Sequence, residues 1–168
     1  MADIALRAMY IRSIDNRVAD HFSRIARPRD YSIRADVFYE VQKEWGSCTV
    51  DAFSSEATAM LPRFWAERAG GAAEAADAFA QEWRGERVWA HPPVGALPQL
   101  AQFLRERPAL EALVCAPLWE GESWFGLLME LASERRDLPR GSCTRVSFDA
   151  PARLESWPMV VFRVSPRA

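Results

Sequence analysis

The chain has 168 residues, a formal net charge of −2, 49% hydrophobic residues and 26% charged residues. This size and composition fit a single globular domain with a buried core, and the near-neutral charge gives no bulk case for nucleic-acid binding. No apolar run approaches the ~20 residues that cross a bilayer, so no membrane partner is expected.

Cysteine usage and the first residues bear on the compartment. The three cysteines are odd in number and widely spaced, and none falls in a metal-binding pattern, so no metal site is expected. The start of the chain lacks the continuous apolar segment of a signal peptide. We therefore expect free thiols and an intracellular location, nuclear or cytoplasmic.

The first third of the chain is predicted to hold one strand and two helices. Residues 4–13 are rich in apolar and β-forming residues and favour a strand. A short helix capped by Asp15 or Asn16 follows, and the proline at 28 marks a boundary. From Ser32 to Gly46 the apolar residues fall on one helical face, which predicts an amphipathic helix ending at a glycine.

The middle of the chain is predicted to alternate strands with helices. Residues 48–53 read as a short buried strand, and 56–68 as a helix whose middle Pro62 restricts. Residues 72–79 are ambiguous between helix and strand. A turn at 81–85 leads to a strand that should end at His91, because two prolines follow and cannot continue a strand ladder.

The last third continues the same alternation. Here we expect a helix from Leu97 to near Pro108, then the elements that follow in order: a strand at 111–117, a helix at 123–133, a strand at 143–148, a loop at 151–158 and a strand at 159–164. Apolar strands alternating with helices favour a mostly parallel sheet covered on both faces. The two late strands, with no helix between them, predict a C-terminal antiparallel hairpin. The predicted fold class is thus α/β.

A first resemblance concerns residues 1–27, within an N-terminal extension expected to span residues 1–29. The stretch Ile11-Arg-Ser-Ile-Asp-Asn-Arg-Val-Ala-Asp-His-Phe-Ser-Arg24 resembles the end of the ribonuclease H domain of retroelement reverse transcriptases. In that family an aspartate at the position of Asp20 binds catalytic metal. Because a two-metal site needs several carboxylates, this segment alone implies a tail from a neighbouring domain and no nuclease activity. The alternative is an ordinary N-terminal strand and helix.

A second resemblance covers residues 30–130, within a domain expected to span residues 30–168. The stretches Val50-Asp-Ala-Phe-Ser-Ser-Glu-Ala57, Trp83-Arg-Gly85, His91-Pro-Pro-Val94 and Ala116-Pro-Leu-Trp119 resemble, in order, motifs of the methyltransferase-like domain that follows ribonuclease H in DIRS-type tyrosine-recombinase retrotransposons. They are also similar to phage-type DNA adenine methyltransferases. The resemblance implies a small Rossmann-like sheet and S-adenosylmethionine as the cofactor. The implied cofactor-binding residues are Asp51, Phe53 and Asp77, and the implied catalytic residues are His91, Pro92, Pro93 and Val94.

The catalytic motif departs from the family pattern Asn-Pro-Pro-Tyr. In the family, the asparagine and a proline carbonyl accept hydrogen bonds from the target amino group, and the aromatic ring stacks on the flipped base. Here His91 replaces the asparagine and cannot reproduce the amide's donor and acceptor pair. Val94 replaces the aromatic residue, and Ser54-Ser55 stand where glycines would permit close approach to the cofactor. We therefore expect the motif to be catalytically degenerate.

Each of these residues also has a structural interpretation. His91 could simply end its strand, Asp51 could cap the next helix, and Asp77 could be a solvated helix residue. Four tryptophans near the expected loop edge could form a ligand platform or pack in the core, and Trp119 is the one for which we least expect the core: Trp83, Trp89, Trp119 and Trp124. Candidates for phosphate contacts, or for a solvated turn, are Arg135, Arg136 and Arg140.

Three functions remain open at this point. The first is a retroelement-derived, methyltransferase-like domain that no longer catalyses and that binds nucleic acid or protein. The second is an active S-adenosylmethionine-dependent DNA adenine methyltransferase. The third is a host protein that reuses the fold as a structural subunit of a larger assembly.

Overall fold

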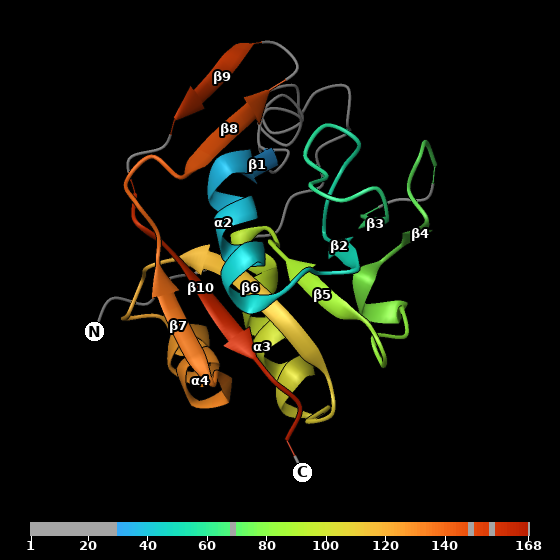
Figure 1. Ribbon diagram of the computed structural model, residues 1–168, viewed down its shortest axis with the longest axis vertical. Coiled ribbons are helices and arrows are strands. Elements are labelled where there is room, and N and C mark those ends of the chain that lie inside the picture. The colour runs from blue at the N-terminus through green and yellow to red at the C-terminus, as the bar shows by residue number, and fades with distance from the viewer. Residues whose placement is uncertain (1–29, 68–69, 148–149, 155–156, 168) are drawn as a thin grey trace, which may run out of the picture.

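A computed structural model describes residues 30–67, 70–147, 150–154 and 157–167 (Figure 1). The predicted N-terminal tail, with its strand at 4–13 and Asp20, lies outside the described residues. The protein is a mixed α/β structure with a seven-stranded sheet and a separate three-stranded sheet.

The seven-stranded sheet is mostly parallel and has the order β4-β3-β2-β5-β6-β10-β7. Its parallel strands are β2 (Val50–Ala52), β3 (Phe64–Ala66), β4 (Ala75–Ala76), β5 (Arg87–Ala90) and β6 (Glu111–Pro117). β10 (Met159–Val164) runs antiparallel between β6 and β7 (Glu134–Asp137). The chain builds outward from β2 to β4 and then returns to add β5 on the other side of β2. The strand order therefore reverses between β2 and β5.

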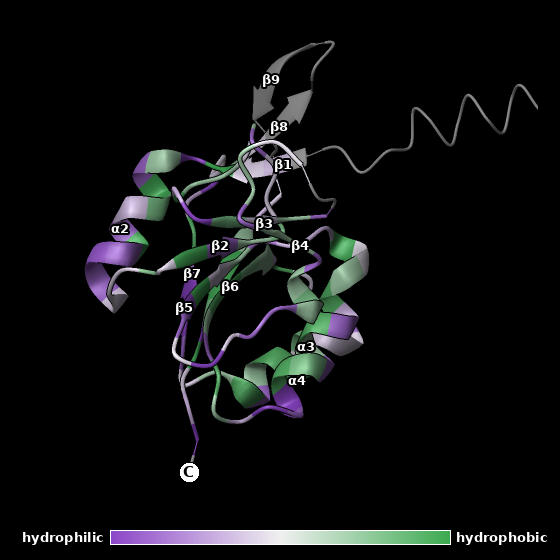
Figure 2. Ribbon diagram, turned by 90° about the vertical axis from the view of Figure 1, so that its right-hand side faces the viewer, coloured by the Kyte–Doolittle hydropathy of each residue, from purple (hydrophilic) through white to green (hydrophobic). Residues whose placement is uncertain are grey.

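Helices cover both faces of this sheet, as the apolar strands predict. α3 (Leu97–Arg105) and α4 (Ser123–Leu131) lie on one face, and α2 (Ala35–Trp45) lies on the other (Figure 2). β6 is apolar after Glu111 because both of its faces are covered: Val114 packs into the cluster under α3 and α4, while Leu113 and Cys115 pack into the cluster under α2. A strand buried on both faces needs apolar residues at successive positions.

The three-stranded sheet is antiparallel and lies at one end of the molecule (Figure 1). Its strands are β1 (Asp30–Ile33), β8 (Cys143–Ser147) and β9 (Ala150–Leu154), in the order β1-β8-β9. Antiparallel pairing near the C-terminus is thus present, but with other partners than expected. The strands predicted at 143–148 and 159–164 lie in different sheets, and residues 150–154, predicted as a loop, form β9.

Several elements coincide with their predictions. β6 and β10 have the expected bounds, and α3 and α4 lie in the expected segments. α2 ends at Trp45, where Gly46 adopts a φ of +94°. A side chain at Gly46 would also collide with the Arg87 guanidinium, whose Nη1 donates to the Trp45 carbonyl at 3.2 Å. The helix begins at Ala35 and not at Ser32, because residues 30–33 pair with β8.

The predicted helix at 56–68 is wrong. Residues 56–58 form only a turn, and a loop leads to β3, which pairs with β2 and β4 on its two sides. Pro62 cannot donate one of the hydrogen bonds of a helix, and pairing with β2 and β4 favours a strand over the helix at residues 64–66. The ambiguous segment 72–79 contains β4 and the start of a short 3₁₀ helix, η1 (Ala78–Ala80).

Candidate functional site

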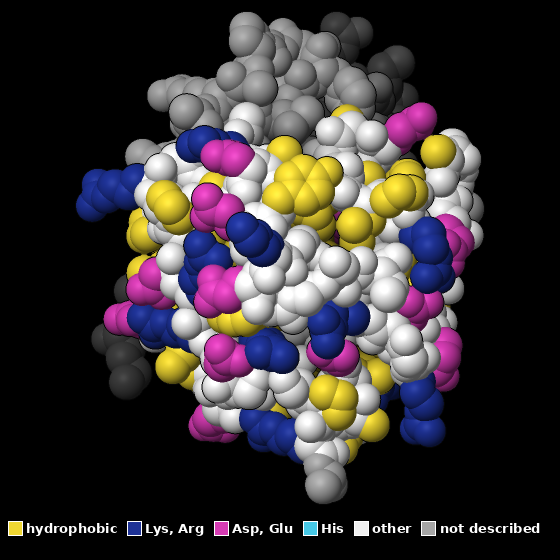
Figure 3. Space-filling model, in the orientation of Figure 1, with side chains coloured by type: hydrophobic (Ala, Val, Ile, Leu, Met, Phe, Trp, Pro, Cys, Tyr) yellow, Lys and Arg dark blue, Asp and Glu magenta, His cyan; other side chains and the backbone are white. Residues whose placement is uncertain are grey.

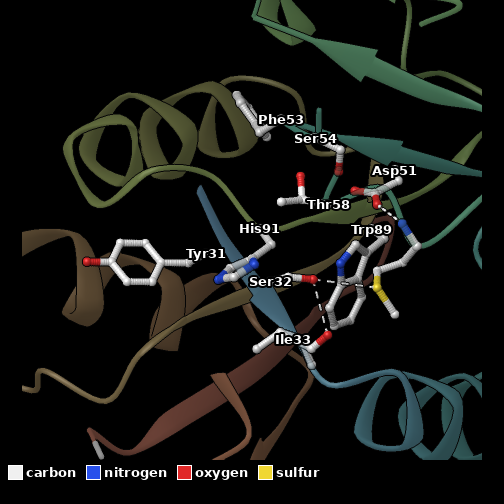
Figure 4. A pocket seen from close by; sticks show the side chains of 10 residues that line it. Tyr31, Ser32, Ile33, Asp51, Phe53, Ser54, Thr58, Trp89 and His91 are labelled. Atoms are coloured by element: carbon white, nitrogen blue, oxygen red, sulfur yellow. Dashed lines mark hydrogen bonds between the residues drawn. The ribbon is translucent and has the colours of Figure 1, made fainter. Parts of the chain in front are cut away.

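A small pocket lies at the carboxyl ends of β2 and β5, where the strand order reverses. This is the position at which open α/β sheets bind ligands. The pocket brings together three of the predicted site residues, Asp51, Phe53 and His91 (Figure 4). The rest of its lining consists of Tyr31, Ser32, Ile33, Ser54, Thr58, Met60 and Trp89. The cavity measures about 10 Å³, which is roughly the room of one water molecule.

Asp51 is the most buried polar residue of the pocket, with 1% of its surface exposed. The backbone N–H of Met60 donates to its Oδ2 at 2.7 Å, whereas Oδ1 has no hydrogen-bond partner among the described residues. Burial raises the pKa of the carboxyl to about 6, against the opposing effect of the Met60 N–H and the Ser54 side chain. Asp51 does not cap a helix, because no helix forms between β2 and β3; it orders the loop through Met60.

His91 follows β5 and is partly buried beside the pocket. Burial lowers the pKa of its imidazole to about 4, so the ring is neutral at physiological pH. A neutral imidazole offers one donor and one acceptor. Of the predicted catalytic stretch, only His91 lines the pocket; Pro92 is buried, Pro93 is exposed, and Val94 is partly buried against the core under α3.

Phe53 directly follows β2 and adopts a left-handed conformation, with a φ of +67°. This backbone region is unusual for a bulky residue and commonly marks a constrained site. The ring explains how the conformation is held, because it packs on Phe79 at 5.1 Å and on Trp83 at 6.4 Å between ring centroids. The next residue, Ser54, donates its N–H to the Trp65 carbonyl at 3.2 Å. The loop after β2 is therefore anchored to β3.

Asp77 does not join the other predicted cofactor residues. It is exposed at the end of β4, with a φ of +56°, and its Oδ1 accepts the Phe79 N–H at 3.1 Å. This bond caps η1, so the residue is solvated, as the structural alternative expects, but it caps a 3₁₀ helix. Asp77 is not among the residues that line the pocket.

Sequence reasoning missed the residues that close the pocket. Ser32 comes from β1, and its hydroxyl lies 3.8 Å from the Met60 sulfur (Figure 4). Thr58, in the turn after β2, donates or accepts at 3.1 Å with Ser55. The only local signal was the β-forming triplet Tyr-Ser-Ile after Pro28. Its pairing with residues 143–146 spans more than 100 positions, and no local pattern reports such a contact.

The tryptophans divide as the sequence suggested. Trp83, Trp89 and Trp124 are buried, with 1%, 1% and 3% of their surfaces exposed. Trp119 is 37% exposed, beside Trp157, with 6.2 Å between the ring centroids. Core packing therefore explains three of the four rings, and Trp119 is at the surface.

Two of the three arginines proposed for phosphate contacts pair with carboxylates. Arg136 lies in β7 and binds Glu40 at 3.1 Å and Glu44 at 2.6 Å, which ties α2 to the sheet. Arg135 binds Asp137 at 3.0 Å. Basic and acidic side chains are interspersed over the face that Figure 3 shows. Arg140 is exposed in the turn before β8.

Among the described residues, no group of three or more His, Cys, Asp or Glu side chains is placed to hold a metal ion, and no helix is long and apolar enough to span a bilayer. Comparison of the chain with protein-family models, with curated proteins and with solved structures gave no match. Function is therefore inferred from the sequence and the geometry of this chain.

Proposed function

We propose that this chain is a methyltransferase-like domain that no longer transfers methyl groups and acts as a protein-binding module. The parallel strands β4-β3-β2-β5-β6 follow the order 3-2-1-4-5 of dinucleotide-binding sheets. An antiparallel strand inserted next to the last parallel strand, as β10 is here, is typical of S-adenosylmethionine-dependent methyltransferases. This agreement supports a Rossmann-like, methyltransferase-type fold; a retroelement origin rests on the sequence resemblance alone.

The small volume of the pocket is the main support for a loss of methyl transfer. Ligand pockets commonly enclose about 300–1,000 Å³, whereas the cavity beside Asp51 and His91 holds about 10 Å³. Side chains of β1 and of the loop after β2 line and close this cavity. S-adenosylmethionine therefore does not fit without displacement of β1 or of the loop that carries Met60.

The loop after β2 argues in the same direction. Phosphate and nucleotide sites at this position use glycines and the N–H groups of a following helix. Here Phe53 and Ser54 occupy the loop, and its residues 56–58 form only a turn. His91 lacks the amide's donor and acceptor pair, and Val94, partly buried against the core under α3, has no ring to stack on a flipped base as the intact motif does.

Surface charge favours protein over nucleic acid as the partner. Binding to nucleic acid depends on Lys and Arg side chains that are free to neutralise phosphates. Most arginines with described side chains form ion pairs instead, as Arg63 does with Glu74 and Glu86. The surface is thus a mixture of neutralised pairs, with no single-sign field over the face in Figure 3.

Calorimetry with S-adenosylmethionine tests the proposal. We expect no saturable heat with S-adenosylmethionine at concentrations up to about 1 mM, where a Kd of that size corresponds to a binding free energy of about −4 kcal/mol. We also expect no transfer of labelled methyl groups to unmethylated DNA. A folded sample is verified by its thermal transition before titration. Saturable micromolar binding would contradict the proposal and favour the hypothesis of an active DNA adenine methyltransferase. Gel-shift titration with duplex DNA at about 0.15 M salt should show no complex, and a stable one would replace protein with nucleic acid as the partner.

A further inference from the structure

Three aromatic rings form a continuous row at the carboxyl edge of the main sheet. Tyr31 belongs to β1, Trp157 precedes β10, and Trp119 follows β6. The ring centroids of Tyr31 and Trp157 are 5.3 Å apart, and those of Trp157 and Trp119 are 6.2 Å apart. Tyr31 also lines the pocket beside His91 and turns its hydroxyl away from Asp51 (Figure 4). We call these three side chains the aromatic row.

The exposed end of the row is fixed by backbone hydrogen bonds. The Trp119 N–H donates to the Pro117 carbonyl at 2.9 Å, and its carbonyl accepts the Glu122 N–H at 3.1 Å. The Leu118 N–H donates to the Pro158 carbonyl at 2.9 Å, which joins this turn to the segment of Trp157. A large ring held on an ordered turn loses little conformational entropy on binding, and tryptophan is enriched among residues that dominate binding energy.

Acidic side chains flank the row. Glu120 has a side chain that is 68% exposed, and Glu122 is also exposed. Arg135 approaches Glu120 at 3.7 Å, but it is shared with Asp137 at 3.0 Å. The turn that carries Trp119 is therefore negative, which disfavours the phosphates of a nucleic acid and favours a ligand with a basic residue.

The geometry points to a proline-rich peptide as the occupant, and we propose that the aromatic row binds such a segment in the polyproline II conformation with an adjacent Arg or Lys. This inference rests on the proposed protein-binding role. Polyproline II rises ~3.1 Å per residue, so two residues span about 6 Å, close to the spacings of the rings. The rings are inclined by 60° and 84° to their neighbours. Tyr31 and Trp157 are partly buried against the cluster under α2, and Trp119 is the exposed ring of the row. Aromatic surfaces of this kind recognise prolines, and the peptide loses little entropy because its conformation is preformed.

The test is a titration of the 168-residue chain with a synthetic peptide of eight prolines followed by two arginines. We expect saturable binding by calorimetry. In ¹⁵N-labelled protein, the indole resonances of Trp119 and Trp157 should shift, while those of the buried Trp83 and Trp124 should not. Trp119→Ala should weaken binding by at least about tenfold, about 1.4 kcal/mol, and Trp119→Phe should retain most of it. Met129→Ala is the matched control, because Met129 is a similarly exposed apolar side chain (42%) on α4.

Four results would overturn the inference. These are no saturation at millimolar peptide, equal affinity for a Gly-Ser peptide with the same two arginines, tighter binding of a ten-nucleotide oligothymidylate, or unchanged affinity in Trp119→Ala. If the alanine variant lacks a normal thermal transition, the indole shifts of the unmodified chain decide the question. Failure here leaves the cofactor calorimetry unaffected, so the loss of methyl transfer is judged separately.

Discussion

The two halves of the main sheet are built in different ways. β5, β6, β10 and β7 have 4, 7, 6 and 4 residues and are accompanied by α3 and α4. β2, β3 and β4 have 3, 3 and 2 residues, and no α-helix lies between them in the described chain. The first half is a layered core of regular elements, whereas the second is a set of short strands joined by loops.

Side-chain contacts replace regular elements in the β2–β4 half. Trp83 packs on Trp65, Phe53 and Phe103 with centroid distances of 5.9, 6.4 and 5.1 Å, and its Nε1 donates to the Ala78 carbonyl at 2.7 Å. A single ring thus joins the loop after β2 to β3, η1 and α3. The difference shows that one sheet can combine elements specified by periodicity with elements specified by a few large side chains.

Truncation of a core ring in the regular half should have the largest effect. Phe162 of β10 is fully buried and lies 5.2 Å from Phe125 of α4. Phe162→Ala should lower the free energy of unfolding by about 3–5 kcal/mol, measured by urea unfolding, with amide exchange accelerated in β6 and β10 alike. Phe162→Leu conserves most of the volume and should cost less than about 1.5 kcal/mol. A loss below about 1 kcal/mol for the alanine variant would show that this half is not the more cooperative one.

The pocket between the halves should give two opposing pH dependences. Asp51 titrates at about 6 in the folded chain and near 3.8 when unfolded, so the stability it contributes is present below pH 3.8 and is lost as pH rises through 6. This loss is on the order of 3 kcal/mol. His91 titrates at about 4 and normally at 6.5, so its contribution is present above pH 6.5 and is lost as pH falls through 4. Partial exposure of His91 makes its effect the smaller of the two.

Single variants separate these contributions. In Asp51→Asn, His91 is the only one of the two groups that still titrates. The free energy of unfolding should therefore rise as the pH increases from 4 to 6.5, and more than it does in the unmodified chain. In His91→Gln it should fall more steeply over the same range. Chemical unfolding at four or five pH values provides the measurement. Parallel curves for all three proteins would mean that Asp51 and His91 keep ordinary pKa values and that the pocket is open to water.

The same division explains what could be predicted from the sequence. The bounds of β6 and β10 follow from apolar runs that end at proline or polar residues, and Gly46 marks the end of α2. The segment 56–68 carries helix-forming residues, but β3 forms there because its neighbours β2 and β4 supply hydrogen bonds that local propensity does not report. The pairing of β1 with β8 is equally non-local.

The candidate site was only partly predictable for the same reason. Strand ends bring Asp51 and His91 to one edge of the sheet, and strand ends were visible in the sequence. Asp77 was also expected to bind the cofactor, but its own backbone turn commits its carboxylate to the Phe79 N–H. Ser32 and Met60 close the pocket through loop and strand contacts that no spacing indicates.

A smaller effect is expected at Trp83, the ring that joins the elements of the β2–β4 half and that we call its aromatic hub. Trp83→Phe keeps an aromatic ring but removes the hydrogen bond to the Ala78 carbonyl and part of the ring volume. We expect a loss of about 1–3 kcal/mol, with amide exchange accelerated in residues 50–66 and little change in β6. Trp124→Phe, at a buried tryptophan on α4, is the matched control and should accelerate exchange in α3 and α4 instead. Uniform acceleration in both variants would mean that the halves unfold as one unit.

The smallest effect should come from the exposed ion pairs of Arg63, at the start of β3 in the same half. Arg63 donates from Nε to Glu74 at 2.7 Å and from Nη2 to Glu86 at 2.9 Å, and so links the segments that precede β3, β4 and β5. Its side chain is 45% exposed, so solvent screens both pairs, and Arg63→Gln should lower the free energy of unfolding by less than any of the changes above. The loss should shrink further in 1 M NaCl, where the Debye length is about 3 Å. A larger, salt-independent loss would show that the guanidinium acts through packing of its stem, and that polar contacts hold the short strands as firmly as the aromatic hub does.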